Sequence, residues 1–230
     1  MSAGRNPAAP AGGTGSPSAL LREGLLQLEV PEPDRVQPLL ERYLDELERC
    51  NPRFGLVNAT DRAELVTKHV LDSLSAWRAV RDALPPLGGA VLDVGSGAGL
   101  PGIPLAAALP HSAVTLMDRM VRRVSFLKTC CVLLGLPGLR AVQSDLRDAS
   151  GEYDVVTFRA VAPLDRFLSD LGASAVRWRT VVAYKGREDR AREEAAAAHA
   201  FVGPNEDLAI VPLRPPFLEE ERCLLIARRK

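Results

Sequence analysis

The fold of this chain is decided by one stretch, Val91-Leu92-Asp93-Val94-Gly95-Ser96-Gly97-Ala98-Gly99-Leu100-Pro101-Gly102. An apolar run suited to a buried strand ends there in a glycine-rich turn, and Pro101 suits the start of a helix. Glycines in such a turn permit positive φ and let the backbone approach a ligand closely. The dinucleotide fingerprint G-x-G-x-x-G does not fit, because Leu100 stands three positions after Gly97. The pattern is D-x-G-x-G-x-G, which predicts either a different ligand site or an ordinary tight strand–helix turn.

Short apolar runs alternate with helical patterns from residue 90 onward. The strand-like runs are Ala90–Val94, Val114–Met117, Leu139–Gln143, Val155–Phe158, Thr180–Tyr184, Leu208–Leu213 and Cys223–Ala227. The helical patterns are Pro101–Leu109, Arg119–Gly135, Pro163–Ala175 and Arg187–Ala200. This alternation predicts an α/β fold, in which helices cover both faces of a mostly parallel sheet. No helix separates the last two strands, so we expect them to form an antiparallel hairpin.

The N-terminal part of the chain has a different pattern. Its first residues are mostly Ala, Gly, Pro and Ser, which predicts a disordered tail. Two amphipathic helices follow, one ending at Asn51-Pro52 and one running from Asp61 to about Val80. The predicted organisation is a tail of residues 1–19, a helical extension of residues 20–84 and one α/β domain of residues 85–230, with the extension packed on the domain.

The composition of the 230 residues is that of a globular protein. A quarter of them are charged and 47% are hydrophobic, which excludes wholesale disorder. The 29 basic and 29 acidic residues balance, which excludes the general positive field of a nucleic-acid coat protein but allows a local basic patch.

The four cysteines lack the C-x-x-C spacing of zinc sites, so no metal is expected. With no apolar run long enough for a membrane span and no signal peptide, we expect a cytoplasmic protein that acts as a monomer.

A second feature, Asp118, agrees with a nucleoside ligand. It ends the second predicted strand, 19 residues after Gly99, where a carboxylate can accept hydrogen bonds from both hydroxyls of an adenosine ribose. The glycine spacing, this aspartate and the terminal hairpin resemble class I S-adenosylmethionine-dependent methyltransferases, which have a Rossmann-like, mostly parallel seven-stranded sheet. The resemblance implies S-adenosyl-L-methionine as the cofactor. Its predicted contacts in this part of the chain are Asp93, Gly95, Gly97, Gly99, Leu100 and Asp118.

The residues after the fourth predicted strand narrow the chemistry of methyl transfer. Methylation at carbon 5 of a pyrimidine needs a cysteine nucleophile, commonly after proline, and none of the four cysteines follows a proline. Methylation of exocyclic amino groups commonly uses an Asn/Asp-Pro-Pro-aromatic run, where this chain has Thr157-Phe158-Arg159-Ala160-Val161. No His or Lys there supplies an obvious base, so we expect a substrate atom that attacks without losing a proton. Guanine N7 fits, because its lone pair is exposed on the base edge.

Several segments resemble one family, the bacterial 16S ribosomal RNA guanine-N7 methyltransferases, also called glucose-inhibited division protein B. These segments are Lys68–Leu74, Leu92–Leu105, Arg123–Leu127, Arg159–Leu164 and Tyr184–Gly186, of which Gly99–Pro104 is the most specific part. The resemblance implies direct methyl transfer to N7 of a guanosine in the 530 loop of 16S rRNA, at nucleotide 527. The partner would be the bare rRNA or the small ribosomal subunit.

The same resemblance carries further cofactor contacts onto Leu146, Arg147 and Arg159. Arg159 is also the expected catalytic residue, in a positioning role without acid–base work, and a surface arginine is the alternative. The family commonly has Ala-Glu at Leu146-Arg147, so the reversed charge at Arg147 favours a contact through its backbone. The family often has Asn-Leu-Thr where Gly55-Leu56-Val57 stands here, which weakens any inference for that loop.

Basic residues that cluster despite overall neutrality are predicted to contact RNA. They are Arg119, Arg122, Arg123 and Lys128, with Lys185 as a further candidate. A solvated helix face is the alternative for the first four, and a cap of the sheet edge for Lys185. We expect His69 to be structural, and Asp72 and Ser73 to fix the N-terminal helices over the cofactor site. The first alternative function is a methyltransferase acting on a small molecule. The second is a nucleotide-binding or NAD-dependent protein, against which the glycine spacing already speaks.

Overall fold

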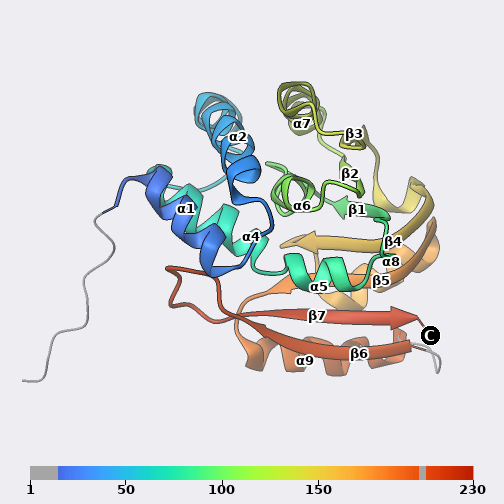
Figure 1. The fold of residues 1–230 in the computed structure, drawn as a ribbon. Coiled ribbons are helices and arrows are strands. Elements are labelled where there is room, and N and C mark those ends of the chain that lie inside the picture. Colours follow the sequence, from blue (N-terminus) through green and yellow to red (C-terminus); the bar gives the residue numbers. More distant parts are fainter. Residues whose placement is uncertain (1–14, 202–205, 230) are drawn as a thin grey trace, which may run out of the picture.

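A seven-stranded sheet forms the centre of the computed structural model, which describes residues 15–201 and 206–229 (Figure 1). Its strands are β1 (Ala90–Val94), β2 (Ala113–Asp118), β3 (Arg140–Gln143), β4 (Ser150–Arg159), β5 (Ala175–Lys185), β6 (Glu206–Leu213) and β7 (Arg222–Arg229). They lie in the order β3-β2-β1-β4-β5-β7-β6. The first five strands pair in parallel, whereas β7 runs antiparallel to both β5 and β6. The predicted sheet and its antiparallel hairpin are confirmed.

Helices pack against both faces of this sheet. On one face α6 (Gly102–Ala108) and α7 (Val121–Leu134) contact β2, and α7 also contacts β3. On the other face α8 (Leu164–Ala173) contacts β5, and α9 (Glu188–Ala198) contacts β6 and β7. Successive strand residues point to opposite faces, so Val181 belongs to one hydrophobic core and Val182 to the other. The sheet is therefore buried on both sides, as a parallel sheet requires.

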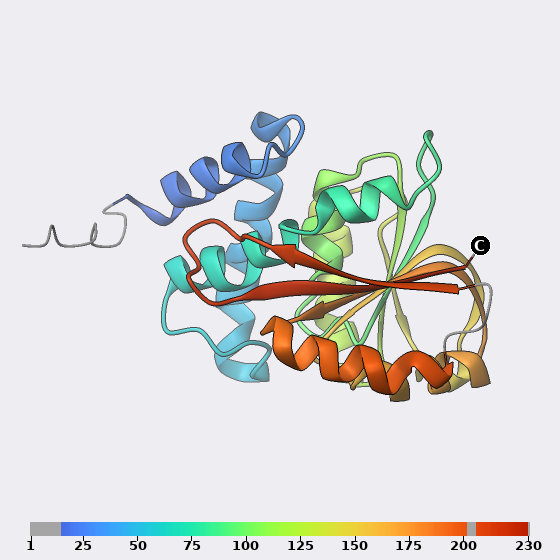
Figure 2. The same ribbon diagram turned by 90° about the horizontal axis from the view of Figure 1, so that it is seen from below.

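The N-terminal helices are α1 (Pro17–Gln27) and α2 (Pro33–Phe54), which share a hydrophobic core with α6 and α7. Figure 2 shows α1, in dark blue, on the side of the sheet opposite α9, in orange. The predicted tail of residues 1–19 needs correction at its end, because α1 begins at Pro17. Ser16 caps that helix by accepting a hydrogen bond from the Ala19 N–H, and proline suits the first helical position. Residues 1–14 lie outside the described part of the chain.

The end of α2 is also later than predicted. Pro52 lies inside the last turn, and the helix continues to Phe54 before Gly55 ends it in the left-handed conformation. The Gly55 N–H donates to the carbonyl of Asn51 at 2.8 Å. Proline removes only one hydrogen bond there, so glycine and not proline is the stop signal of this helix.

The second predicted extension helix, from Asp61 to about Val80, is broken into pieces. It consists of α3 (Arg62–Glu64), the π-helical segment η1 (Leu65–Leu71), α4 (Asp72–Leu74) and, after a turn, α5 (Trp77–Asp82). Asp61 starts it by accepting a hydrogen bond from the Glu64 N–H at 2.9 Å. The π-helical segment packs against α1, and π segments of this kind occur frequently at functional sites.

Candidate active site

The glycine turn connects β1 to α6 and has an unusual backbone. Gly95, Gly97 and Gly99 have φ angles of 67°, 57° and 91°, in the left-handed region that favours glycine. A Cβ atom on Gly95 would lie 2.6 Å from Val161 Cγ2, whereas one on Gly97 would meet only the Gly95 carbonyl oxygen, at 3.8 Å. Val161 therefore packs closely against the Gly95 backbone, where a side chain would clash. The backbone of Gly97 has open space beside it.

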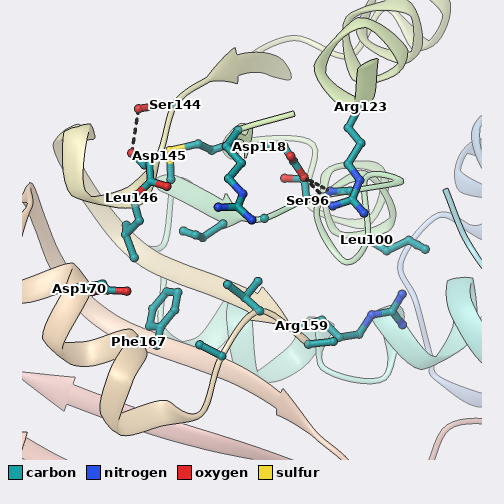
Figure 3. A pocket seen from close by; sticks show the side chains of 18 of the residues that line it. Ser96, Leu100, Asp118, Arg123, Ser144, Asp145, Leu146, Arg159, Phe167 and Asp170 are labelled. Carbon is teal, nitrogen blue, oxygen red and sulfur yellow. Dashed lines mark hydrogen bonds and ion pairs between the residues drawn. The ribbon is translucent and has the colours of Figure 1, made fainter. Parts of the chain in front are cut away.

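A cavity of about 1040 Å³ opens above this turn, at the carboxyl ends of β1, β2 and β4 (Figure 3). Ligands of open α/β sheets bind at such strand ends. Gly95, Gly97, Leu100, Asp118, Leu146, Arg147 and Arg159 line the cavity, so most of the predicted cofactor residues lie together. Figure 3 shows Asp118 on one side of the cavity and Leu146 with Phe167 across from it. The volume is sufficient for a nucleoside-sized ligand.

Asp118 is held in place by the turn that it faces. Its Oδ2 accepts a hydrogen bond from the Gly97 N–H at 3.0 Å, and its Oδ1 accepts one from the Met120 N–H at 2.8 Å. The Arg123 guanidinium lies 3.5 Å from Oδ2. A carboxylate has about four acceptor positions, so two are left for further donors such as ribose hydroxyls.

Asp93 and Gly99 do not line the cavity, contrary to the expected ligand contacts. Asp93 is fully buried beneath the turn, where its Oδ2 accepts a hydrogen bond from the Gly102 N–H at 3.1 Å. Burial raises the pKa of Asp93 to about 7, and its Oδ1 has no hydrogen-bond partner. A Cβ on Gly99 would lie 2.3 Å from Ile103 Cδ1, so this glycine packs against α6. Both residues shape the turn from below.

The segment after β3 brings Leu146 and Arg147 to the cavity in a 3-10 turn, η2 (Leu146–Asp148). The Arg147 guanidinium is bound by Asp170, at 2.6 Å and 2.9 Å, and the Arg147 N–H donates to Asp145 Oδ1 at 3.2 Å. The expected backbone contact of Arg147 would therefore have to compete with Asp145. Only Leu146 of this pair offers an unoccupied surface, which is apolar.

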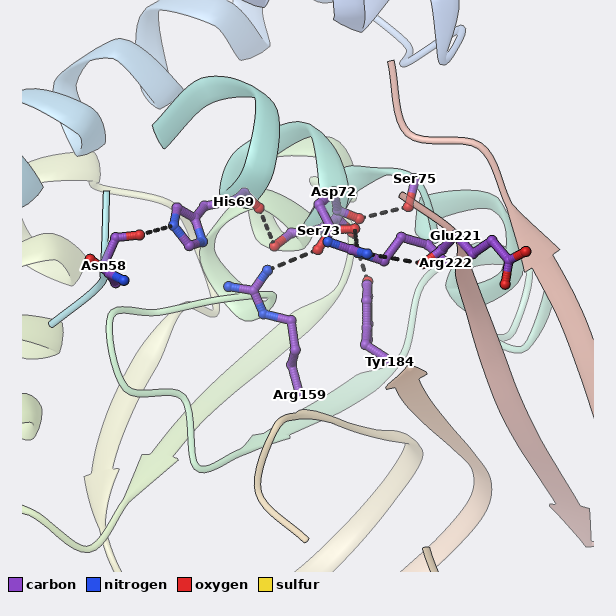
Figure 4. A network of polar contacts seen from close by, with 9 residues as sticks. All are labelled: Asn58, His69, Asp72, Ser73, Ser75, Arg159, Tyr184, Glu221 and Arg222. Atoms are coloured by element: carbon purple, nitrogen blue, oxygen red, sulfur yellow. Dashed lines mark hydrogen bonds and ion pairs between the residues drawn. The ribbon is translucent and has the colours of Figure 1, made fainter. Parts of the chain in front are cut away.

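Arg159, at the end of β4, is tied to the helical extension (Figure 4). Its Nη1 donates to Oδ2 of the buried Asp72 at 3.0 Å, and Arg222 Nε lies 3.3 Å from the other oxygen of Asp72. The hydroxyl of Tyr184, on β5, donates to the carbonyl of Ser73 at 2.7 Å. We call Asp72, Arg159, Tyr184 and Arg222 the Asp72 cluster. Sequence reasoning placed Asp72 and Ser73 over the site but missed Arg222, because no motif links the start of β7 to the extension.

His69 lies next to this cluster but outside the cavity lining. Its Nε2 is 3.2 Å from the Asn58 carbonyl oxygen, and burial lowers the pKa of His69, which keeps the ring neutral at pH 7. This geometry agrees with the expected structural role.

The predicted RNA-binding residues separate into two groups. Arg119, Arg122, Arg123 and Lys128 are exposed on α7 and the turn before it, and Arg119 and Arg123 also line the cavity. The Lys185 side chain is only 12% exposed: its Nζ lies 2.6 Å from Glu194 and donates to the Ala162 carbonyl at 3.3 Å. Lys185 therefore joins β5 to α9 through its ion pair with Glu194. Its ammonium group is not displayed on the surface, as an RNA contact would require.

The described residues contain no group of three His, Cys, Asp or Glu that could hold a metal ion. No helix among them has the length and apolar character needed to cross a membrane.

Comparison with known proteins agrees with this geometry. The model of the family described as rRNA small subunit methyltransferase G matches residues 36–216. The chain belongs to this family. The relative from Treponema pallidum is 40% identical over 92% of this chain and 94% of its own length, and the one from Bordetella pertussis is 31% identical over 94% of both chains. Both carry the name ribosomal RNA small subunit methyltransferase G.

Solved structures similar to this member of the methyltransferase G family share its fold. Magnesium protoporphyrin IX methyltransferase from Synechocystis has a TM-score of 0.53 and 20% identity, and it covers 81% of this chain and 94% of its own. That structure contains the demethylated cofactor, and another of the same protein, with a TM-score of 0.52 at 17% identity, contains S-adenosylmethionine. The predicted class I methyltransferase fold, the enzyme class and the cofactor S-adenosylmethionine are confirmed.

The residues of this chain fit that cofactor. The open space at Gly97 lets the backbone lie against a nucleoside, and the free acceptor positions of Asp118 suit ribose hydroxyls. Apolar side chains of Leu146 and Phe167 suit an adenine ring on the opposite wall. Asp145 lies beside them and offers an acceptor for the adenine amino group.

Proposed function

We propose that this enzyme transfers a methyl group from S-adenosylmethionine to N7 of a guanosine in the 530 loop of 16S rRNA, at nucleotide 527. One observation carries the choice of atom: among the described residues, the cavity is lined by no His, Cys, Lys or Tyr. Such a site lacks the usual nucleophile for carbon-5 methylation and the usual bases for removing a proton. It suits an acceptor atom that already has a free lone pair, as guanine N7 does.

Two of the four aspartates that line the cavity support this interpretation, because they already bind other groups. Asp118 accepts two backbone hydrogen bonds, and Asp170 binds the Arg147 guanidinium. The work left to the protein is alignment and exclusion of water. When bound, S-adenosylmethionine supplies a methyl group activated by the sulfonium. Asp118 would orient the ribose, and the glycine turn would lie against the nucleoside. Val161, packed on Gly95, lines the same cavity.

The surface beside the cavity supports RNA as the substrate. Arg119, Arg122, Arg123 and Lys128 form a local basic patch on a protein without net charge. Cations at such a surface bind phosphates in a salt-dependent manner. We expect the enzyme to act as a monomer, on the bare rRNA or the small subunit, in the cytoplasm where ribosomes are.

The test is mass mapping of 16S rRNA after incubation of bare RNA, and of small subunits, with the enzyme and S-adenosylmethionine. We expect one N7-methylguanosine, in the 530 loop, and none when that guanosine is replaced by adenosine. Methylation of another atom would contradict the proposal. Turnover of a free metabolite without RNA would instead identify a small-molecule methyltransferase.

The RNA surface is tested separately by Arg122→Gln combined with Lys128→Gln, two exposed cations outside the cavity lining. We expect weaker RNA binding and a salt slope that falls by about 1 for each phosphate no longer bound, with unchanged cofactor affinity. Arg190→Gln on α9 is the matched control, because Arg190 is also exposed and lies on the opposite face of the sheet. A salt slope equal to that of the control would place the RNA elsewhere.

A further inference from the structure

The Asp72 cluster contains more positive than negative charge. Asp72 is only 4% exposed, and each of its carboxylate oxygens faces a different guanidinium, Arg159 at 3.0 Å and Arg222 at 3.3 Å. Two guanidiniums and one carboxylate leave an excess of one positive charge. The side chains of Arg159 and Arg222 are only 20% and 26% exposed, so an anion that compensates this excess would be favoured.

The other titratable groups around the cluster do not supply that anion. His69 and Tyr184 are neutral at pH 7, since burial lowers the pKa of the former and raises that of the latter. Burial also raises the pKa of Asp93 to about 7, so this group carries only part of a charge. The carboxylate of Glu221 accepts a hydrogen bond from the Glu188 N–H at 3.4 Å and so faces α9.

Arg159 is the member of the cluster that brings this excess positive charge to the cavity. This residue lines the cavity, and among the described residues its guanidinium makes no hydrogen bond or ion pair apart from that with Asp72. Arg222 lies behind Asp72 and outside the cavity lining, where its Nη1 donates to the Glu221 carbonyl at 2.9 Å. Figure 4 shows the two arginines approaching Asp72 from different elements. Arg222 thus neutralises a carboxylate that would otherwise compensate Arg159 fully.

We propose that Asp72 and Arg222 are positioning residues of the cofactor site, which hold Arg159 at the cavity wall and leave it enough positive charge to receive an anion. Two anions come to this site in methyl transfer to RNA: the carboxylate of the cofactor's amino-acid end and an RNA phosphate. The carboxylate is favoured, because Arg159 lines the cofactor cavity and the exposed cations of α7 lie elsewhere on its rim. The inference rests on the cofactor and not on which base is methylated.

The test is calorimetric binding of S-adenosylhomocysteine to the full chain, without RNA and without turnover. Arg222→Gln leaves Asp72 to Arg159 alone, so we expect affinity to fall about tenfold, the scale of one charge-assisted interaction. Arg222→Lys keeps the charge and retains most of the affinity. The double variant Asp72→Asn with Arg222→Gln removes the competing carboxylate as well, so its affinity rises above that of Arg222→Gln.

Two controls separate this role from a merely structural one. Binding of 5′-methylthioadenosine, which lacks the amino-acid end, should be the same in Arg222→Gln and the unchanged protein. Arg177→Gln, which removes an exposed arginine paired with Glu152, should change neither ligand's affinity. Equal losses for both ligands in Arg222→Gln, or a double variant that binds more weakly than the single one, would overturn the proposal.

A third measurement distinguishes the two anions. Binding of 16S rRNA should be unaffected by Arg222→Gln if the cofactor carboxylate is the anion. A loss confined to RNA binding, with S-adenosylhomocysteine bound normally, supports the charge sharing and assigns the anion as a phosphate. Unchanged binding of both ligands would contradict any positioning role. Thermal unfolding of each variant shows whether it is folded, and the Arg222 variants test the proposal even if Asp72→Asn does not fold.

Discussion

The glycine turn of residues 95–99 lines the cavity, and the Asp72 cluster reaches the same cavity through Arg159, yet the two are built in opposite ways. The turn is a continuous piece of backbone, fixed by its own φ angles and by Asp118 on the neighbouring strand. The cluster joins side chains 87 positions apart, Asp72 and Arg159, and adds Arg222 from β7. The difference teaches that the end of the site proposed for the ribose depends on local backbone, whereas the opposite end depends on the packing of the extension. Changes in the two regions should therefore have different consequences.

The largest effect is expected for Asp118→Ala. This change removes the proposed ribose acceptor and leaves the N–H groups of Gly97 and Met120 unpaired, so S-adenosylhomocysteine should bind about 3 kcal/mol more weakly. Calorimetry measures the change. Asp170→Ala, at the cavity rim, is the matched control and should cost under about 1 kcal/mol, since its ion pair with Arg147 is exposed. Unchanged affinity in Asp118→Ala would show that the turn does not hold the ribose.

A pH-dependent effect of about 2 kcal/mol is expected from Asp93 beneath the turn. Its pKa of about 7 lies above the unfolded value of 3.8, so the folded state retains a proton that the unfolded state releases. This stabilisation is full below about pH 4 and is lost as the pH rises through 7. Urea unfolding of the unchanged protein and of Asp93→Asn should diverge between about pH 5 and 8, with the variant losing less stability. Parallel curves would contradict the raised pKa.

A smaller effect, on the free energy of unfolding, should distinguish Gly95 from Gly97 in the turn. Gly95→Ala combines a positive φ with a clash against Val161, and should destabilise the fold by about 2 kcal/mol. Gly97→Ala has the positive φ without the clash, and should cost about 1 kcal/mol. Urea unfolding compares the two variants. Equal costs would mean that Val161 moves aside and that the turn is less rigid than its backbone indicates.

The smallest effect is expected in the Asp72 cluster, from Tyr184→Phe. Losing the hydroxyl leaves the buried Ser73 carbonyl without that donor and should cost about 1 kcal/mol of unfolding free energy. S-adenosylhomocysteine should also bind slightly more weakly, because the backbone beside Asp72 is less well fixed. Tyr153→Phe is the control, since Tyr153 makes no hydrogen bond through its side chain among the described residues. A cofactor affinity equal to that of the control would separate the extension from the site.

The same contrast explains what could be predicted from the sequence. The alternation of strands and helices and the path from Val91 to Gly102 depend on short-range patterns, and the structure has the expected backbone there. The ribose role proposed for Asp118 rests on the same kind of pattern. The break of the second extension helix and the burial of Lys185 depend on what packs against them. Spacing alone does not reveal that Glu194 reaches Lys185, or that Arg222 reaches Asp72. Such contacts form between distant segments once the sheet is complete.

The position of β7 has a consequence for truncated chains. This strand is the last described one, yet it lies inside the sheet, hydrogen-bonded to β5 on one side and β6 on the other. A premature stop codon just before Arg222 would therefore remove an interior strand of the sheet and not an edge strand. Without β7, β5 becomes an edge strand with unpaired backbone groups, and such an edge is prone to aggregation. β6 also loses the strand that it pairs with. A nonsense allele at this position is expected to be as severe as one far upstream of it.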